Sequence, residues 1–269
     1  MWNPYERLSP GARRGLGIGA VVVVLLVWAG LSGSGMVGPA KLPTPWAVVS
    51  AFFRLAWDAD PPKGQPNSLL LTATMWSVGR IVVASTLVML IGIPIGVLMG
   101  ASPRVNAVLS PLVDPFRAAP VVAISPILIM WFGIDEGMKI AFLFCGAVVY
   151  LVPMVRDAVR AVPQAYWMSA RDLGATPFES VRLVLVPLAM PRIADAIIAA
   201  LSIMWTYITV AEYVNATAGL GQLIQNARRF SAMDQVFVGI FVIIALALVT
   251  YQGLQKLKAH LFSWETRND

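Results

Sequence analysis

Two ionisable residues within apolar stretches, Glu212 and Arg80, are the first candidates for a chemical role in this sequence. A charged side chain at membrane depth is costly, so such residues pair with one another, face a water-filled cavity or mark a path for ions or solutes. Arg80 is one conceivable partner for Glu212. The rival interpretation places Glu212 at an outer interface beside Tyr213 and Asn215, and the residue types alone leave both interpretations open.

Polar and aromatic residues in the same apolar stretches are further candidates for a solute path. Each of them also suits helix packing, because serine and threonine commonly hydrogen-bond across membrane helices. Pro120 and Pro126 would bend the stretch that carries two of them, Ser125 and Trp131. The candidates are Ser125, Trp131, Trp205, Thr206, Tyr207 and Thr209, together with Glu212.

Catalytic constellations are absent from the sequence. It has no GxxxxGK[ST] segment to hold a nucleotide phosphate, so the chain itself is not expected to hydrolyse ATP. His260, the single histidine, and Cys145, the single cysteine, are too few for a Cys/His metal cluster or an intrachain disulfide. Asp157 and Asp172 have basic neighbours and suit solvated loops. The sequence therefore predicts no catalytic residue, no metal site and no cofactor in this chain.

The composition indicates an integral membrane protein. The 269 residues are 58% hydrophobic and 13% charged, with a mean hydropathy of +0.74, whereas a soluble domain carries about 25% charged residues. The net charge of +6 and the pI near 9.8 would favour nucleic acid as the partner of a soluble chain. In a membrane protein, basic residues mainly report which loops stay in the cytoplasm, so no nucleic-acid partner is expected.

Charge-free stretches recur along the chain and predict an all-α membrane protein with about six spans, five being possible. The third and fourth stretches are the weakest, and Pro120 and Pro126 interrupt the third. A signal peptide is the rival interpretation of the first stretch. We expect the helix that holds the second stretch to begin near Ser68. The stretches are 15–40, Ile81–Pro103, Ala118–Ile134, Ile140–Val155, Ala196–Ala211 and Val236–Leu254.

These stretches divide the chain into five parts. Residues 1–14 are an N-terminal segment, 15–40 are the first span, and 41–67 are a periplasmic segment in which Thr44 and Pro45 open a short helix. Residues 68–255 form a core that contains a polar loop at 160–187. Residues 256–269 form a C-terminal tail.

The distribution of basic residues favours both termini and the polar loop on the cytoplasmic side. With six spans, 13 of the 20 basic residues fall in cytoplasmic segments and six outside, in agreement with the positive-inside rule. Arg228 and Arg229, which fall on the outer side, are the main exception.

The polar loop at 160–187 carries two helix signals. Pro163 and Gly174 suit the start and the end of a first helix, since proline is favoured in the first turn and glycine just past the end. Thr176 followed by Glu179 matches a capping box that opens a second helix. We call this pair of helices the elbow.

The elbow is the predicted contact site for a soluble partner. If ATP is consumed in the cytoplasm and solute crosses elsewhere, a rigid element must carry motion between the two places. Small residues would allow close approach, and larger apolar residues would anchor the contact. The predicted contact residues are Tyr166, Trp167, Ser169, Ala170, Arg171, Asp172, Leu173, Gly174 and Ala175.

The elbow resembles the cytoplasmic coupling loop of bacterial ABC importer permeases of the nitrate, sulfonate and taurine branch. That loop follows the pattern Glu-Ala-Ala, three residues, Gly and, about nine residues later, Ile-x-Leu-Pro. Ala170, Gly174, Val184 and Val186-Pro187 occupy the matching places. The first positions depart from the pattern, since Met168 and Ser169 stand where the family has glutamate and alanine. Met168 removes the carboxylate that would form a salt bridge there.

Other stretches resemble the same branch in order and spacing, so that the resemblance covers about Leu42–Leu261. They are Leu42-Pro43-Thr44-Pro45 with Val48 and Phe52, Gly92-Ile93-Pro94-Ile95-Gly96, Trp131-Phe132-Gly133-Ile134, Arg171-Asp172-Leu173-Gly174-Ala175, and Ala211-Glu212 followed by Ala218-Gly219-Leu220-Gly221.

The resemblance implies a permease of the bacterial inner membrane that pairs with a second copy of itself and with a periplasmic solute-binding protein. It also implies two separate ATP-binding subunits, which hold ATP and Mg²⁺ and move the elbow. The implied function is import of a small anion such as a sulfonate, taurine, nitrate or bicarbonate.

Three alternatives belong to other classes of protein. A secondary carrier or channel without ATP coupling would need coupling-ion residues and inverted repeats, and the sequence shows no clear repeat. A membrane-embedded enzyme would need a convergent acid/base set. The segment from Ala170 to Arg182 also resembles a DNA-binding helix-turn-helix, but its second helix would run into the membrane near Pro187.

Overall fold

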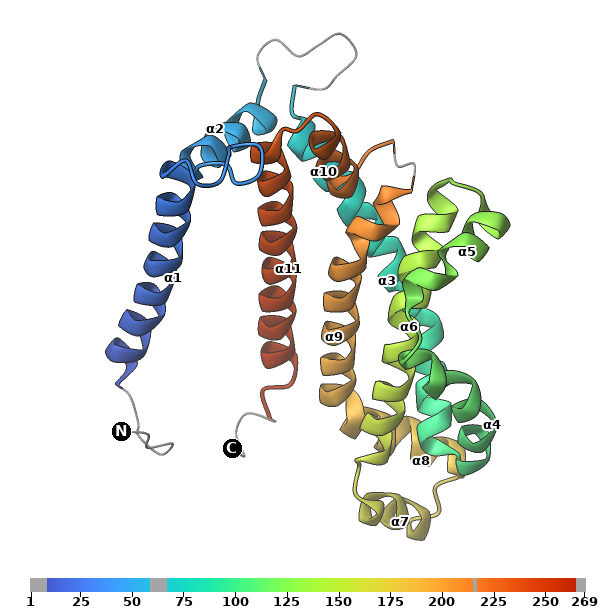
Figure 1. The fold of residues 1–269 in the computed structure, drawn as a ribbon. Helices are drawn as coiled ribbons and strands as arrows, with labels where there is room; N and C mark the ends of the chain where they lie inside the picture. Colours follow the sequence, from blue (N-terminus) through green and yellow to red (C-terminus); the bar gives the residue numbers. More distant parts are fainter. Residues whose placement is uncertain (1–8, 59–66, 215–216, 265–269) are drawn as a thin grey trace. The chain divides into compact units, whose positions relative to one another are not determined.

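The computed structural model describes residues 9–58, 67–214 and 217–264, and within them every regular element is helical (Figure 1). This confirms the predicted all-α class. The helices are α1 (Pro10–Gly33), α2 (Pro45–Ala56), α3 (Leu69–Ala101), α4 (Pro103–Val113), α5 (Ser125–Phe132), α6 (Glu136–Arg160), α7 (Gln164–Asp172), α8 (Pro177–Ser180), α9 (Val186–Tyr213), α10 (Leu220–Arg229) and α11 (Met233–Leu261).

Five continuous helical stretches among the described residues are long and apolar enough to cross a membrane. They are Gly11–Gly33, Leu69–Ala101, Glu136–Arg160, Pro177–Tyr213 and Met233–Leu261. A bent pair, Pro103–Arg117 and Val121–Phe132, makes a sixth candidate and turns by 99° at its break. The expectation of six spans, with five possible, is confirmed.

The third span differs from its prediction. Ala118–Ile134 is not one helix, because 3₁₀ turns at Asp114–Arg117 and Val121–Ile124 precede the eight-residue α5. Pro120 separates the two turns and Pro126 lies in the first turn of α5. Proline lacks an N–H and so cannot continue the hydrogen-bond ladder of a helix. The bend at the prolines was predicted correctly, whereas the helical segment Pro103–Arg117 before it was not placed in this span.

Helix ends extend beyond the charge-free stretches. α3 begins at Leu69, in agreement with the predicted start near Ser68. α9 begins at Val186 and ends at Tyr213, well outside the predicted Ala196–Ala211. Parts of the predicted segments 1–14, 41–67 and 256–269 lie outside the described residues.

The chain divides into two compact units, one made from residues 1–69 and 223–240 and the other from 70–222 and 241–269. In the first unit, the Trp28 ring of α1 stacks on Phe237 of α11 with ring centroids 5.7 Å apart. The Trp28 indole N–H donates to the carbonyl of Pro43 over 2.9 Å. Thr44 then caps α2 through its hydroxyl, which accepts from the amide of Ala47, as its place before Pro45 predicts.

In the second unit, α3 and α6 run parallel and touch along a line of glycines. Gly92, Gly96 and Gly100 lie one helical turn apart on α3 and face the side chains of α6. A Cβ added at Gly96 would lie 2.6 Å from the Cβ of Val155, and one added at Gly100 would lie equally close to Val159. Such close backbone approach is typical of packing between membrane helices.

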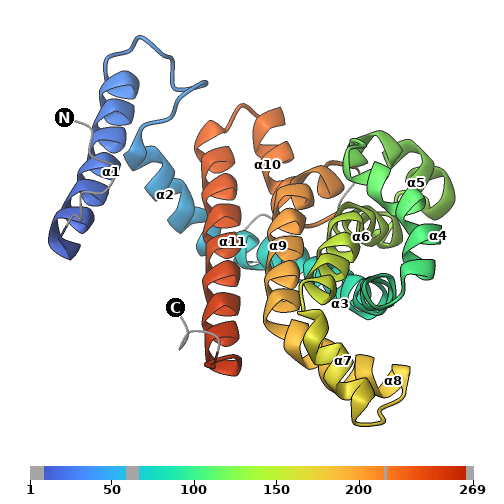
Figure 2. The ribbon, with the colours of Figure 1, turned by 90° about the horizontal axis from the view of Figure 1, so that it is seen from below.

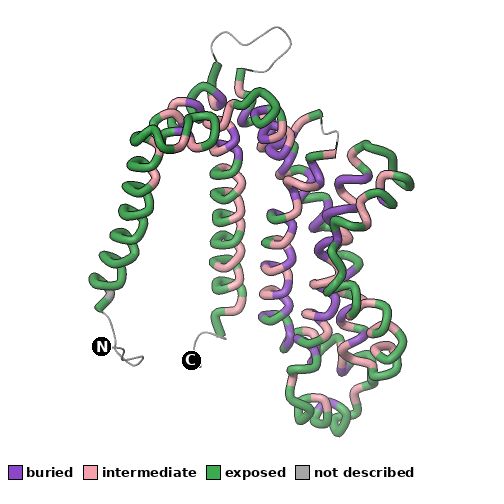
Figure 3. Tube along the Cα trace, viewed as in Figure 1, coloured by how far each residue is buried: buried purple, intermediate pink, exposed green. Residues whose placement is uncertain are grey.

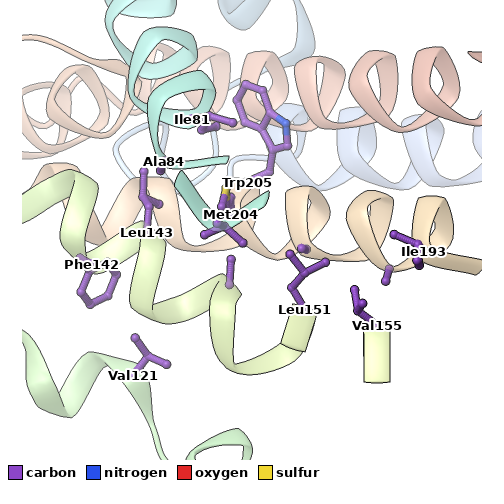
Figure 4. Close-up of a cluster of buried hydrophobic side chains, with 14 of the residues drawn as sticks. Ile81, Ala84, Val121, Phe142, Leu143, Leu151, Val155, Ile193, Met204 and Trp205 are labelled. Carbon is purple, nitrogen blue, oxygen red and sulfur yellow. The ribbon is translucent and has the colours of Figure 1, made fainter. Parts of the chain in front are cut away.

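Helix α9 packs antiparallel to α6 and completes the core of the second unit. The α6 residue Gly146 makes room for the ring of Tyr207, whose edge would lie 2.7 Å from an added Cβ. Phe142, Leu143, Leu151, Ile193 and Met204 are all at most 1% exposed and meet between these helices (Figure 4). Figure 3 shows the buried positions gathered along α6 and α9.

Candidate functional site

The first helix of the elbow forms as predicted. It is α7, which is one residue shorter than the expected Gln164–Leu173. α7 ends at Asp172, where the amide of Gly174 donates to Arg171 and the amide of Ala175 donates to Ala170, both over 3.0 Å. These two bonds close the helix only if Gly174 takes a left-handed conformation, and its φ is +87°. Glycine at this position therefore fixes the angle at which the chain leaves α7.

The second helix of the elbow begins with the predicted capping box. The Glu179 amide donates to the Thr176 hydroxyl over 3.3 Å, and the Thr176 amide donates to the Glu179 carboxylate over 2.8 Å. Pro177 lies in the first turn, where its missing N–H costs nothing. The local residue pattern is sufficient to start this helix.

The second helix is not a separate short helix. α8 continues through a π-helical turn, Val181–Leu185, directly into α9. Pro187 has no N–H to donate to the carbonyl of Leu183, and the wider turn just before it accommodates that missing bond. The elbow is therefore one short helix, α7, linked to the end of a long membrane helix. Figures 1 and 2 show α7 beside α8 at the end of the second unit.

Large apolar side chains project from the elbow. Leu173 is 89% exposed and Phe178 is 70% exposed, and Tyr166, Met168 and Leu183 are also exposed. Met168, Phe178 and Leu183 were not among the predicted contact residues. Their apolar type within a polar loop was the signal that could have found them. Large apolar side chains that are exposed mark an interaction surface.

The predicted contact residues do not all lie on this surface. Ser169, Arg171, Asp172 and Gly174 are exposed, and Ala175 is half-buried. Ala170 is buried, and the half-buried Trp167 packs against the core. Ala170 and Trp167 therefore hold the elbow to its own chain.

A cluster of charged side chains, all buried except the partly exposed Glu136, lies at the opposite end of α6 and α9 from the elbow. Arg80 of α3, 3% exposed, donates from Nη1 to Glu212 Oε1 over 2.7 Å. Its Nε and Nη2 donate to the two carboxylate oxygens of Glu136, over 2.6 and 2.7 Å. Lys139, also buried, donates to Glu136 Oε1 over 2.7 Å. Two cations thus balance two anions among these four side chains.

The cluster also binds the loop that follows α9. The Ser77 hydroxyl donates to Glu212 Oε1 and accepts from the amide of Leu220, and the Gly221 amide donates to Glu212 Oε2. An added Cβ at Gly219, whose φ is +132°, would lie 2.5 Å from Glu212. Only glycine fits there, which explains the Gly-Leu-Gly sequence of this loop.

The Arg80–Glu212 pair was a conceivable partnership from sequence, and the structure places the two side chains in contact. Glu136 and Lys139 were missed, because they precede the predicted fourth span at Ile140. Their spacing of three residues at the start of an apolar run was the signal that could have found them. Arg80 also lies with its guanidinium carbon 5.6 Å from the ring centre of Trp76, in the wall of a pocket of 390 Å³.

The predicted path residues are dispersed. Trp131 is 69% exposed on α5, whereas Trp205 is 5% exposed in the core. The Ser125 hydroxyl donates to the carbonyl of Val122, and Thr209 is half-buried. Both carboxylate oxygens of Glu212 are occupied within the cluster. Contact between these residues and a solute stays a prediction.

Comparison with known proteins identifies a family for most of this chain. Residues 92–258 match the family described as "Binding-protein-dependent transport system inner membrane component". The taurine transport system permease protein TauC of Escherichia coli is 32% identical over 93% of this chain and 89% of its own length. The putative aliphatic sulfonates transport permease protein SsuC of Bacillus subtilis is 30% identical over 96% of this chain and 91% of its own.

Solved structures share the fold. A chain of the MetNI methionine ABC transporter, in inward facing conformations, superposes with a TM-score of 0.64 over 71% of this chain and 95% of its own length. The two sequences are 22% identical, so this likeness concerns the fold alone.

Proposed function

The chain belongs to the family of binding-protein-dependent inner membrane transport components, as a permease subunit of an ABC importer, and we propose that its solute is a small organic sulfonate such as taurine. The observation that carries this proposal is the match, over more than 90% of the chain, to permeases named for taurine and for aliphatic sulfonates. The secondary carrier and the membrane-embedded enzyme are set aside, because the family is one of ABC importers.

The elbow is the element that we assign to the ATP-driven partner. Leu173 and Phe178 project into solvent at the end of the bundle where α6 and α9 are joined through α7. A separate ATP-binding subunit, which carries ATP and Mg²⁺, would bury these side chains in a groove. Because Met168 stands where the family has glutamate, the partner surface that faces it would be apolar.

Motion of the elbow would reach the membrane through α9. α8, the π turn and α9 form one continuous helical stretch, Pro177–Tyr213, without an intervening loop. Movement of Phe178 towards a partner therefore displaces the inner end of α9 directly. Two copies of the chain would enclose the solute path between them, and a periplasmic solute-binding protein would deliver the sulfonate to its outer end.

The elbow assignment is tested by co-purification of the tagged chain with its ATP-binding subunit. Leu173→Asp places a charge in the proposed contact and should abolish both co-purification and solute-dependent ATP hydrolysis. Phe230→Asp is the matched control, since Phe230 is 83% exposed in the connection between α10 and α11. Equal recovery of the ATP-binding subunit with both variants would overturn the assignment.

The solute class is tested by uptake into proteoliposomes that contain the whole transporter and its binding protein. Radiolabelled taurine or a short alkanesulfonate should enter only with ATP, and the corresponding carboxylate should compete poorly. ATP-driven uptake of nitrate or bicarbonate, without uptake of sulfonates, would refute the solute proposal and leave the elbow assignment standing.

A further inference from the structure

Helix α2 has two apolar faces. Val48, Ala51 and Leu55 recur at helical spacing and are buried. On the opposite side, Trp46, Val49 and Phe53 recur at i, i+3 and i+7 and are 77%, 44% and 65% exposed. Trp57, at the end of the helix, is 68% exposed. Large apolar side chains in such a row, open to solvent, call for a second apolar environment.

The contacts of α2 within its own unit fix its level in the membrane. Arg54 pairs with Asp234, the second residue of α11, over 2.8 Å. Trp28, five residues before the end of α1, stacks on Phe237, four residues after the start of α11. α1 therefore ends at the level where α11 begins, and α2 lies at that same level (Figure 1). Both α1 and α11 are candidate membrane spans, so this level is a boundary of the bilayer.

The length and the residue types of α2 suit that boundary. Twelve residues of helix reach about 18 Å, which is too short to cross a hydrocarbon core of about 30 Å. Tryptophan prefers the membrane interface, where its ring meets acyl chains and its N–H meets headgroups. The apolar row also continues an apolar surface, because none of the most apolar window of α1 is buried.

Basic residues at the same boundary complement lipid phosphates. Arg54 is exposed beside Phe53, and Arg228 and Arg229 are exposed in the last turn of α10, a few residues before α11 begins. These two arginines are the main exception to the positive-inside distribution. Helices that lie in an interface combine arginine with tryptophan and phenylalanine in this way.

We propose that α2 is an interfacial helix that lies along the membrane surface with Trp46, Val49, Phe53 and Trp57 in the acyl-headgroup region of the bilayer. Arg54, Arg228 and Arg229 contact the phosphates of the same leaflet. The helix holds the outer ends of α1 and α11 at a fixed depth, and its occupant is lipid rather than another protein. This proposal does not depend on the identity of the solute.

The test uses nitroxide labels on single cysteines in the full-length chain with Cys145→Ser, reconstituted in vesicles of phosphatidylethanolamine and phosphatidylglycerol. Labels at Trp46→Cys and Phe53→Cys should collide several-fold more often with oxygen, which partitions into lipid, than with a water-soluble nickel complex. Leu25→Cys in α1 and Lys41→Cys in the following loop supply the lipid and water references.

Two results would overturn the proposal. Collision of the Phe53 and Trp46 labels with the nickel complex at the rate of the Lys41 label would place the row in water. A label that collides with neither reagent would show that protein covers the row. A label whose spectrum is broadened by the label on a second copy of the chain would show the same. The highly exposed Trp46 keeps the test valid if a label at Phe53 disturbs folding.

Discussion

Arg80 is the central residue of the charged cluster at the end of the second unit opposite the elbow. It links α3 to α6 through Glu136 and to α9 through Glu212, and its Nη1 also donates to the carbonyl of Ala218 over 2.7 Å. Removing one of these acceptors would leave an uncompensated charge in an apolar setting. The cluster is neutral as a whole, which favours a structural role over solute binding.

Glu212→Gln should destabilise the chain by about 3 kcal/mol, the lower part of the range for breaking a buried ion pair, because Arg80 keeps Glu136. The amide oxygen can still accept from Ser77, but the NH2 group then faces the amide of Gly221, so the loss includes that hydrogen bond as well as the charge. Unfolding in detergent with increasing SDS, followed by circular dichroism, measures the free energy of unfolding.

The double variant Arg80→Gln/Glu212→Gln supplies the control. It restores neutrality and leaves the Glu136–Lys139 pair intact, so its cost should be smaller than the sum of the two single costs. Strictly additive losses would show that Arg80 and Glu212 stabilise the chain independently of one another.

Residue types predicted this cluster only in part. Charges inside an apolar run stand out, which made Arg80 and Glu212 visible in the sequence. Glu136 and Lys139 border a turn and read as loop residues until the fold brings the start of α6 against α3. Ala170 illustrates the opposite error, since a small residue suits an open contact face and a packed one equally well.

At the scale of elements, the glycine line of α3 sets how closely it approaches α6. Gly96→Ala should cost about 1 to 3 kcal/mol, because the added Cβ would lie 2.6 Å from Val155 Cβ and 2.8 Å from the carbonyl oxygen of Val152, and backbone cannot move aside easily. The shift in thermal midpoint of the detergent-purified protein measures it.

Gly79→Ala is the matched substitution on the same helix. Nothing lies within 4 Å of a Cβ at Gly79, so this variant should gain about 0.5 to 1 kcal/mol from reduced backbone freedom in the unfolded chain. A similar loss of stability in both variants would mean that close packing against α6 is not the reason for glycine at Gly96.

At Gly174, in the turn of the elbow, backbone strain can be separated from steric crowding. An added Cβ at Gly174 meets nothing within 4 Å, yet its φ of +87° disfavours any L side chain. Gly174→Val should reduce ATP-driven uptake strongly, while Gly174→Asn, which tolerates left-handed conformations, should retain most of it. Thermal midpoints should be similar, since the contacts of Trp167 and Ala170 with the rest of the chain are the same in both variants. Equal uptake by both variants would show that the angle of the turn does not matter.

Helix signals predicted the elements better than hydropathy did. The cap residues at Thr176 and Thr44 and the glycine at Gly174 specify local hydrogen bonds, which depend on few neighbours. The break in the third span was predicted from its prolines, but the segment Pro103–Arg117 was missed because Arg104, Asp114 and Arg117 interrupt the charge-free stretch. The extent of α9 was underestimated for a related reason, since charged residues such as Arg192 and Asp195 end a charge-free stretch but not a helix.

At the scale of the whole molecule, the direction of α3 and α6 decides the number of crossings. Arg80, in the first half of α3, contacts Glu136 at the start of α6, and Gly100 near the end of α3 lies against Val159 near the end of α6. Two parallel helices need a connection that returns the chain to the starting side. We therefore propose that the bent pair of α4 and α5 crosses the membrane once, which would give six crossings and place both termini on the same side.

Cysteine labelling in intact cells tests this topology, with Cys145→Ser as the background. Arg104 follows α3 and Asp135 precedes α6, and both are exposed. A membrane-impermeant maleimide should label Asp135→Cys from outside and Arg104→Cys only after the cells are opened, because the bent pair separates them by one crossing. If the pair were a re-entrant loop, both cysteines would react from the same side. That outcome would leave five crossings, with the termini on opposite sides, and would contradict the parallel arrangement of α3 and α6.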